Sequence, residues 1–144
     1  MALTKLATSE VNYVTFLGNL IHIFTPNGTD MNLHAYFDSI ALDQDPVNRI
    51  ERPLNGTFRA VLEAQALEIM AKYSASELDE WVKIKDPHAW GVESYKVAVD
   101  RIYSYTKTNK KITDDYQATI REILFRQIAL GGYRLADAIA TALA

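Results

Sequence analysis

Residues 113–143 read TDDYQATIREILFRQIALGGYRLADAIATAL. Apolar side chains recur in this stretch at every third or fourth position, the spacing that lines one face of an α-helix. Thr113 can cap the first turn. Gly131 and Gly132 cost a helix about 1 kcal/mol each relative to alanine, so we expect them to permit close approach of another helix. The stretch predicts one long helix that buries Tyr116, Ile120, Ile123, Leu124, Ile128, Leu135 and Ile139.

Two further long helices are predicted upstream, each from a start signal followed by helical periodicity. Asp86 at the cap and Pro87 at the first helical position start a helix that we expect to reach about Tyr105. Thr57 can cap another helix, which we expect to reach about Tyr73. The first is expected to bury Trp90, Val92, Tyr95, Val99 and Ile102, and the second Phe58, Val61, Leu62, Ala66, Ile69 and Met70.

Shorter helices and loops are predicted between these elements. Ser76 can cap a short helix that ends near Ile84. Residues 30–42 are expected to form another, and polar residues interrupted by proline and glycine predict a loop at 43–56. A basic, polar loop is predicted at 106–111. The inner face of the helix at 30–42 is expected to be Leu33, Phe37 and Ile40, and the basic residues of the last loop are Lys107, Lys110 and Lys111.

Residues 1–25 allow two interpretations. Apolar residues between Val11 and Ile21 have helical spacing, but Gly18 and Asn19 interrupt it, and residues 20–24 also fit a strand. The sequence PNGT at 26–29 is typical of a hairpin turn, which favours the strand and leaves His22 as a half-buried strand residue. We therefore predict an all-α helical bundle forming a single domain over residues 1–144, with a short β-hairpin near residues 19–27.

Composition narrows the class of protein. Hydrophobic residues make up 49% and charged residues 23% of the 144 residues, a globular composition. The apolar runs are too short to cross a bilayer, so no transmembrane segment is predicted. The formal net charge is −3, so a strongly basic nucleic-acid footprint is absent. Cysteine is absent, which excludes disulfides and thiolate metal sites.

His34 and Asp38 are the candidate metal ligands. They are four residues apart, so a helix places both side chains on one face. An imidazole and a carboxylate arranged in this way can bind one zinc ion, which accepts nitrogen and oxygen ligands. A surface or capping pair is the simpler alternative for an isolated pair of this kind.

Two other polar residues lie in the helix predicted to start at Pro87. His88 is in the first turn and is expected to be exposed. Glu93 stands among large apolar residues, where a carboxylate can be a catalytic or ligand group or can make a structural hydrogen bond to another helix. We favour the structural hydrogen bond.

Three motifs resemble the S1/P1 nuclease family of zinc-dependent phosphodiesterases, which is related to bacterial zinc phospholipase C. The sequence NLHAYFDS at residues 32–39 resembles the family's late metal-ligand motif. The sequence DPHAWGVESY at 86–95 resembles its Trp-x-x-Glu-Ser helix, and GGYRLA at 131–136 resembles its closing helix. The three motifs occur in the family's order and cover roughly residues 30–143.

The resemblance implies a three-zinc cluster that hydrolyses phosphodiester bonds. Only the last pair of family ligands is present, as His34 and Asp38, and the His-x3-Asp-x-His-Gln-Pro-x-His segment is missing. Asn19 matches a family Gly-Gly-Asn segment and is expected near the substrate. In the competing alignment, His22 ends the helix that precedes the missing segment. The family is secreted or periplasmic, but residues 1–5 do not resemble the start of a signal peptide.

Two hypotheses of different classes follow. The chain is the C-terminal portion of a zinc-dependent nuclease, with zinc as cofactor and single-stranded nucleic acid as substrate, completed by a missing N-terminal part or a homo-oligomer partner. Alternatively, it is a non-catalytic helical scaffold or interaction module. The sequence leaves open whether the substrate class is nucleic acid or phospholipid.

Overall fold

The computed structural model describes residues 21–40, 56–108 and 111–144 of the chain. Its elements confirm the predicted all-α class with one short hairpin. In chain order they are β1 (His22–Phe24), β2 (Asp30–Asn32), α2 (Leu33–Ile40), α3 (Gly56–Lys72), α4 (Asp79–Val82), α5 (Pro87–Val97), a π-helical segment (Ala98–Tyr103), α6 (Ser104–Thr108) and α7 (Asp114–Leu143).

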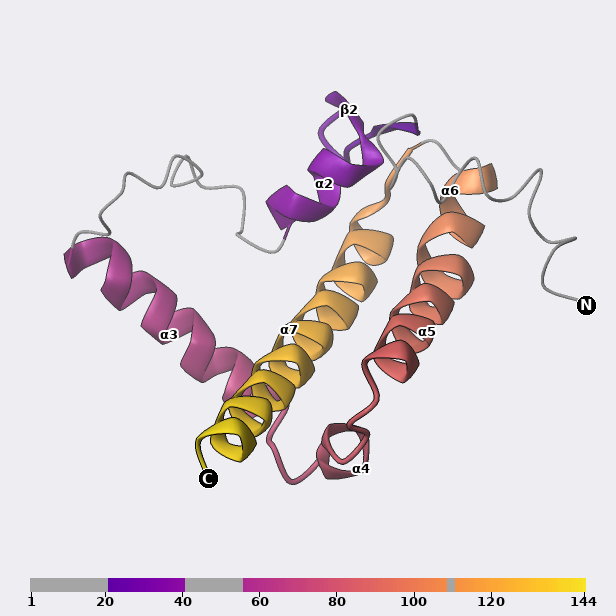
Figure 1. Cartoon of the computed structure of the whole chain (residues 1–144). Coiled ribbons are helices and arrows are strands. Elements are labelled where there is room, and N and C mark those ends of the chain that lie inside the picture. The colour runs from indigo at the N-terminus through magenta and orange to yellow at the C-terminus, as the bar shows by residue number, and fades with distance from the viewer. Residues whose placement is uncertain (1–20, 41–55, 109–110) are drawn as a thin grey trace, which may run out of the picture.

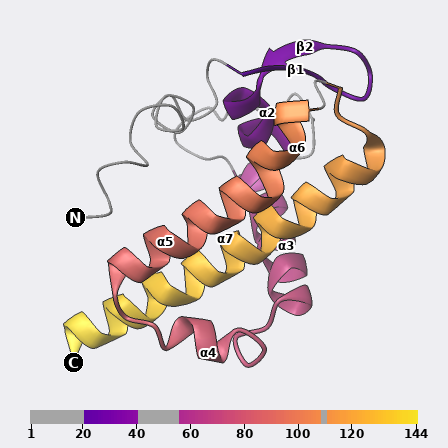
Figure 2. The same ribbon diagram turned by 90° about the vertical axis from the view of Figure 1, so that its right-hand side faces the viewer.

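The continuous helical stretch formed by α5, the π-helical segment and α6 runs beside α7, as Figures 1 and 2 both show. The hairpin and α2 lie at one end of this pair, and α4 lies at the other. The C-terminal end of α3 meets α7, and the N-terminal end of α3 lies away from α7 (Figure 1). At this junction the side chains of Lys72 and Tyr73 contact the Glu122 carboxylate of α7, at 2.5 and 2.6 Å.

The hairpin confirms the predicted turn and corrects the predicted start of the next helix. Strands β1 and β2 are antiparallel, with His22 opposite Asn32 and Phe24 opposite Asp30. Gly28 has a φ of 86°, which glycine adopts without the steric cost that a side chain would add. Residues 30–32 were expected to be helical, but pairing with β1 keeps them extended. The helix starts at Leu33, and Asn32 caps it by accepting a hydrogen bond from the Ala35 amide at 2.8 Å.

The principal core joins the hairpin, α2 and the start of α7. Helix α2 contributes Leu33, Tyr36 and Ile40 to it, so Leu33 and Ile40 are buried as expected, and Tyr36, which the prediction did not include, is buried with them. Phe37 is half-buried and packs against the edge of this core. Because Tyr36 and Ile40 are one turn apart, either aromatic residue satisfies the local spacing. The buried members are Ile23, Leu33, Tyr36, Ile40, Ile112, Tyr116 and Ile120.

Two caps test the predicted helix starts. Asp86 caps α5 as predicted, its side chain accepting a hydrogen bond from the His88 amide at 2.9 Å. Ser76 was expected to cap the short helix, but the residue at its N-cap is Leu78, which makes no side-chain cap hydrogen bond. Ser74 and Glu77 instead close the turn that precedes this helix. The hydroxyl of Ser74 accepts from the Glu77 amide, and the Glu77 carboxylate accepts from the Ser74 amide at 3.0 Å, a reciprocal capping box. The α-helix that follows covers only Asp79–Val82.

The helix that starts at Pro87 extends beyond the predicted end. It passes through the π-helical segment into α6, which ends at Thr108, so the first residues of the predicted loop at 106–111 are helical. The Tyr116 hydroxyl donates to the carbonyl oxygens of Arg101 and Ile102, at 3.1 and 3.3 Å. These two carbonyls belong to the π-helical segment, where backbone pairing departs from the α-helical pattern. Tyr116 therefore links this segment to α7.

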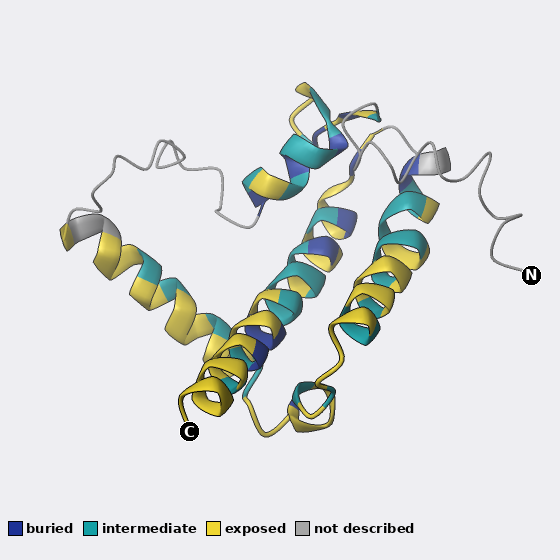
Figure 3. Cartoon of the chain, viewed as in Figure 1, coloured by how far each residue is buried: buried dark blue, intermediate teal, exposed yellow. Residues whose placement is uncertain are grey.

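Parts of the apolar stripes that were expected to be buried are exposed, although Tyr116 and Ile120 of α7 are buried as expected. Figure 3 shows exposed residues along much of α3 and the second half of α7. A methyl side chain at Gly131 or Gly132 would meet no neighbouring segment or side chain within 4 Å among the described residues. The predicted close helix is therefore not found there. Periodicity identifies an apolar face, but it does not say what covers that face. The large exposed residues of these stripes are Val61, Met70, Val92, Tyr95, Ile128, Leu135 and Ile139.

Among residues 21–40, 56–108 and 111–144, no helix combines the length and the hydropathy that a membrane-spanning segment needs.

Alkaline pH is expected to destabilise the fold. Burial raises the pKa of Tyr36 from 10.0 to about 12, and nearby Tyr105 and Asp114 add to the increase. A tyrosine with a raised folded pKa contributes stability that is complete below its unfolded pKa near 10 and is lost as the pH rises towards 12. Two pKa units correspond to at most about 2.7 kcal/mol, and solvent screening reduces this to about 1–2 kcal/mol.

Urea unfolding at several pH values between about 8 and 12 measures this loss. Tyr36→Phe should make the decrease in unfolding free energy shallower, and Tyr95→Phe, at an exposed position, should leave it unchanged. An identical decrease in Tyr36→Phe and in the original chain would contradict the assignment. Burial also raises the pKa of Tyr116, so part of the decrease should remain.

Candidate metal centre

Helix α2 presents His34 and Asp38 away from the core. Successive residues of an α-helix are rotated by about 100°, so these two positions lie on the side opposite Leu33 and Ile40. The three buried residues of α2 hold this orientation by packing against β1 and α7. The Tyr36 hydroxyl also contacts Gln117 of α7, at 3.4 Å. Packing on one face of α2 therefore sets the direction of the polar pair on the other.

The two side chains form an ion pair across one turn of α2. His34 Nε2 lies 3.5 Å from Asp38 Oδ2. Two atoms that each lie about 2.0–2.2 Å from a tetrahedral zinc are about 3.3–3.6 Å apart, so the observed separation is compatible with a shared ion as well as with a direct ion pair. The side chains are 43% and 73% exposed, which leaves them accessible from solution. The structure thus brings together the two residues that the sequence predicted as ligands.

A second histidine–carboxylate pair lies on the hairpin. His22 Nδ1 is 3.1 Å from Asp30 Oδ1, and both side chains are exposed. His22 lies on a strand as predicted, with its neighbour Ile23 fully buried on the other face, but it is exposed rather than half-buried. In the described residues no group of three or more histidine, aspartate and glutamate side chains is arranged to hold a metal ion. Each pair therefore offers two ligands.

Other residues singled out in the sequence have different outcomes. Asn19 lies outside the described residues, so its expected place near the substrate stays a prediction. The side chains of Lys107 and Lys110 also lie outside the described part of the chain. His88 is exposed in the first turn of α5, as predicted.

Glu93 makes the structural contact that was favoured for it. Its Oε2 accepts a hydrogen bond from Arg134 Nη2 at 2.7 Å, which joins α5 to α7. The Glu93 and Arg134 side chains are only 12% and 8% exposed. Arg126 Nη1 lies 3.7 Å from the other carboxylate oxygen. Glu93 is therefore part of a buried ion pair distant in sequence from His34 and Asp38.

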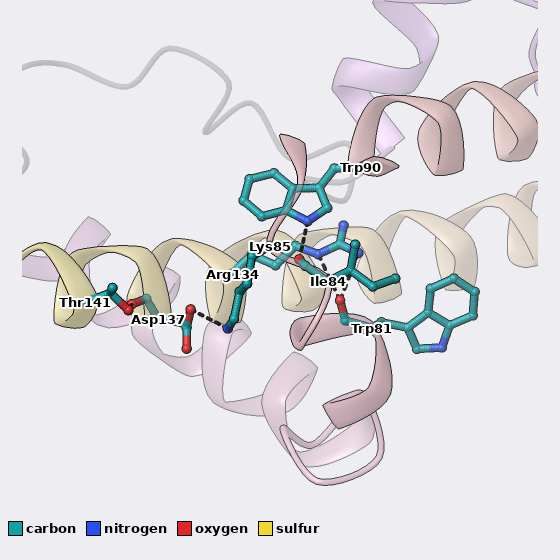
Figure 4. Close-up of polar contacts among 7 residues, drawn as sticks. All are labelled: Trp81, Ile84, Lys85, Trp90, Arg134, Asp137 and Thr141. Atoms are coloured by element: carbon teal, nitrogen blue, oxygen red, sulfur yellow. Dashed lines mark hydrogen bonds and ion pairs between the residues drawn. The ribbon is translucent and has the colours of Figure 1, made fainter. Parts of the chain in front are cut away.

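Arg134 also connects α7 to α4. Its guanidinium donates to the Trp81 carbonyl from Nε at 3.3 Å and from Nη2 at 3.1 Å, as Figure 4 shows. The guanidinium carbon lies 5.3 Å from the centre of the Trp90 ring, and the Trp90 indole donates to the Ile84 carbonyl at 2.6 Å. We call Glu93, Arg134, Trp81 and Trp90 the arginine cluster. It fixes the end of the molecule opposite α2.

Sequence reasoning missed two residues that matter for this arrangement. Arg134 was noted only as part of a motif, although a charged residue among apolar helical neighbours is a signal for a buried partner. Helical spacing did not identify Tyr36 as a core residue, because its neighbour Phe37 satisfies the same spacing. Both residues act through contacts with distant segments.

Comparison with known proteins identifies a family. The sequence model of the S1/P1 Nuclease family matches residues 17–144. Searches of curated proteins and of solved structures gave no significant match. The matched range contains the His34–Asp38 pair and the arginine cluster, and it covers most of the 144 residues. The chain belongs to the S1/P1 nuclease family.

Proposed function

We propose that this chain supplies part of a zinc-dependent phosphodiesterase site, with His34 and Asp38 as two ligands of one zinc ion. The observation that carries the proposal is the 3.5 Å separation of His34 Nε2 and Asp38 Oδ2 on an exposed helix face. Membership of a nuclease family that is generally zinc-dependent supports it. The substrate class that we assign is single-stranded nucleic acid, with Asn19 as a candidate substrate contact.

The donor set fits part of a zinc site. Imidazole nitrogen and carboxylate oxygen are both zinc ligands, but catalytic zinc is normally held by three protein ligands. We therefore propose that the chain functions within a larger S1/P1 nuclease-like domain, to which other segments bring the remaining ligands. Bound zinc lowers the pKa of a coordinated water and polarises a phosphoryl oxygen. The role of α2 in such a site is to hold two ligands at a fixed spacing.

A zinc titration followed by NMR of the histidine side chains tests the ligand assignment. The His34 ring signals should shift with zinc, whereas those of His88, which is exposed on α5, should stay in place. Asp38→Ala should weaken the response at least tenfold, because even the loss of an indirect partner of a metal ligand costs about 10–100-fold in affinity. Asp30→Ala, which removes the carboxylate of the hairpin pair, is the matched control and should retain the His34 response. A response that persists in Asp38→Ala would refute the assignment.

A second candidate function is that of a non-catalytic helical scaffold or interaction module. The exposed apolar residues of α7 favour it, in particular Leu135, which is 61% exposed, and Ile139, which is 51% exposed. Apolar surface of this kind commonly marks contact with another protein segment. Absence of any zinc response at His34, together with an intact fold, would favour the scaffold over the enzyme.

A further inference from the structure

The turn of the hairpin contains a sequence pattern that can accept an N-linked glycan. Residues 27–29 read Asn-Gly-Thr, which fits the pattern of asparagine, any residue except proline, and then serine or threonine. The sequence contains one other match, at residues 55–57, and its asparagine lies outside the described residues. A pattern this short is common, so the case for a modification site depends on the local structure around Asn27.

The pattern lies at an accessible tip of the molecule. Asn27, Gly28 and Thr29 are all exposed, in the turn between β1 and β2. Gly28, at the middle position, has a φ of 86°, and a methyl side chain built there would meet no neighbouring segment within 4 Å among the described residues. Modified residues lie in surface segments of this kind, because an enzyme must reach them. The tip therefore leaves room for a bulky, polar glycan.

The Asn27 side chain is held through its oxygen atom. Asn27 Oδ1 accepts a hydrogen bond from the Thr29 hydroxyl at 3.0 Å and another from the Thr29 amide at 3.3 Å. The Thr25 hydroxyl also donates to Oδ1. Donors around this oxygen stabilise negative charge on it, and they thereby favour loss of a proton from the amide nitrogen Nδ2. All three contacts involve the oxygen, so none of them blocks Nδ2.

We propose that Asn27 is an acceptor for N-linked glycosylation, that the Thr29 hydroxyl supports the reaction, and that the sugar donor is a lipid-linked oligosaccharide diphosphate of the secretory pathway. Asn27 Nδ2 gives one proton to a base of the transferase and forms a bond to the anomeric carbon of the first sugar. The bond from that carbon to the diphosphate oxygen breaks, and the lipid diphosphate leaves with the electron pair. This site is separate from the His34–Asp38 pair and does not depend on the proposed function.

The same turn opposes a competing reaction of asparagine–glycine sequences. In that reaction the Gly28 amide nitrogen attacks the side-chain carbonyl carbon of Asn27 and expels ammonia, and water then opens the cyclic imide to an aspartate. In the hairpin the Gly28 amide donates to the Thr25 carbonyl at 2.9 Å, and the Thr25 amide donates to the Thr29 carbonyl at 2.9 Å. These bonds hold the Gly28 nitrogen in the turn, so Asn27 remains available as an amide.

Expression of the full chain behind a cleavable secretion signal in eukaryotic cells tests the proposal. Every version carries Asn55→Gln, which removes the other match, and an acceptor sequence added after Ala144, which reports that the chain reached the transferase. Glycans should be found at Asn27 and at the added sequence, and peptide N-glycosidase should remove both. Asn27→Gln and Thr29→Ala should each lose the first glycan completely and keep the second. Thr29→Ser keeps the hydroxyl and is the matched control, so it should retain both.

Mass spectrometry of the peptide that contains Asn27 distinguishes the outcomes. A glycan found only at the added sequence would overturn the proposal, because the transferase would have reached the chain and left Asn27 unmodified. A glycan at Asn27 that persists in Thr29→Ala would overturn the role of the Thr29 hydroxyl. Circular dichroism of the variants confirms that the helices are intact. None of these results bears on the zinc response of His34, so the inference and the proposed function can fail independently.

Discussion

Arg134→Met is expected to lower the free energy of unfolding by about 3–5 kcal/mol, because it leaves the buried carboxylate of Glu93 without its principal partner. The guanidinium makes the 2.7 Å contact to Glu93 and also donates twice to the Trp81 carbonyl. Methionine replaces the aliphatic part of the side chain but none of these donors. A domain of this size has about 5–15 kcal/mol of stability in total, so the loss is a large part of it.

Urea unfolding followed by far-ultraviolet circular dichroism measures the change. Lys72→Met is the matched control, because the Lys72–Glu122 pair at 2.5 Å is exposed and such pairs contribute about 0–1 kcal/mol. The double variant Glu93→Gln/Arg134→Met should be more stable than Arg134→Met, since it removes the unpaired charge. A loss below about 1 kcal/mol in Arg134→Met would show that the arginine cluster does not hold the helices together.

Single-stranded DNA is expected to remain intact when it is incubated with this chain alone and added zinc. Loss of a single preorganised group that stabilises developing charge lowers such rates by about 10²–10³-fold. The described residues bring only two candidate ligands to α2, so more than one such group is missing there. The expected rate is therefore more than about a thousandfold below that of a complete zinc nuclease.

Gel electrophoresis of a labelled single-stranded oligonucleotide measures cleavage, with a complete S1-type nuclease as positive control. His34→Ala and Asp38→Ala serve as paired controls for any trace activity. Cleavage that is present in the original chain and absent in both variants would contradict the prediction. It would show that this chain completes a catalytic zinc site, within one molecule or between copies. Cleavage that persists in both variants would indicate a contaminating nuclease.

Local features of the fold were predictable because their causes lie within one or two helical turns. The Asp86 and Thr113 caps depend on an acceptor side chain two or three residues from the amide that it binds. Gly28 marks the hairpin turn for the same local reason, since a positive φ favours glycine. The spacing of His34 and Asp38 is likewise a property of one turn of helix. These features required no knowledge of the rest of the molecule.

The cap of the short helix shows where local reasoning is ambiguous. Ser74 and Ser76 are both good capping residues, but Glu77 pairs with Ser74, and the turn that these two residues close leaves Leu78 at the N-cap of α4. The start of α2 was misplaced for a related reason. Residues 30–32 are compatible with a helix by themselves, but β1 provides backbone partners that hold them extended.

By itself, the sequence determined the three long helices, the hairpin turn and the common face of His34 and Asp38, because short-range sterics and hydrogen bonds decide them. Only the tertiary structure decided which apolar faces are covered. Tyr36 is buried in the core, whereas Leu135 and Ile139, which belong to an equally regular apolar stripe, are exposed. It also paired Glu93 with Arg134, 41 residues apart. Such contacts depend on the path of the chain between distant helices. The spacing of apolar residues at every third or fourth position carries no information about that path.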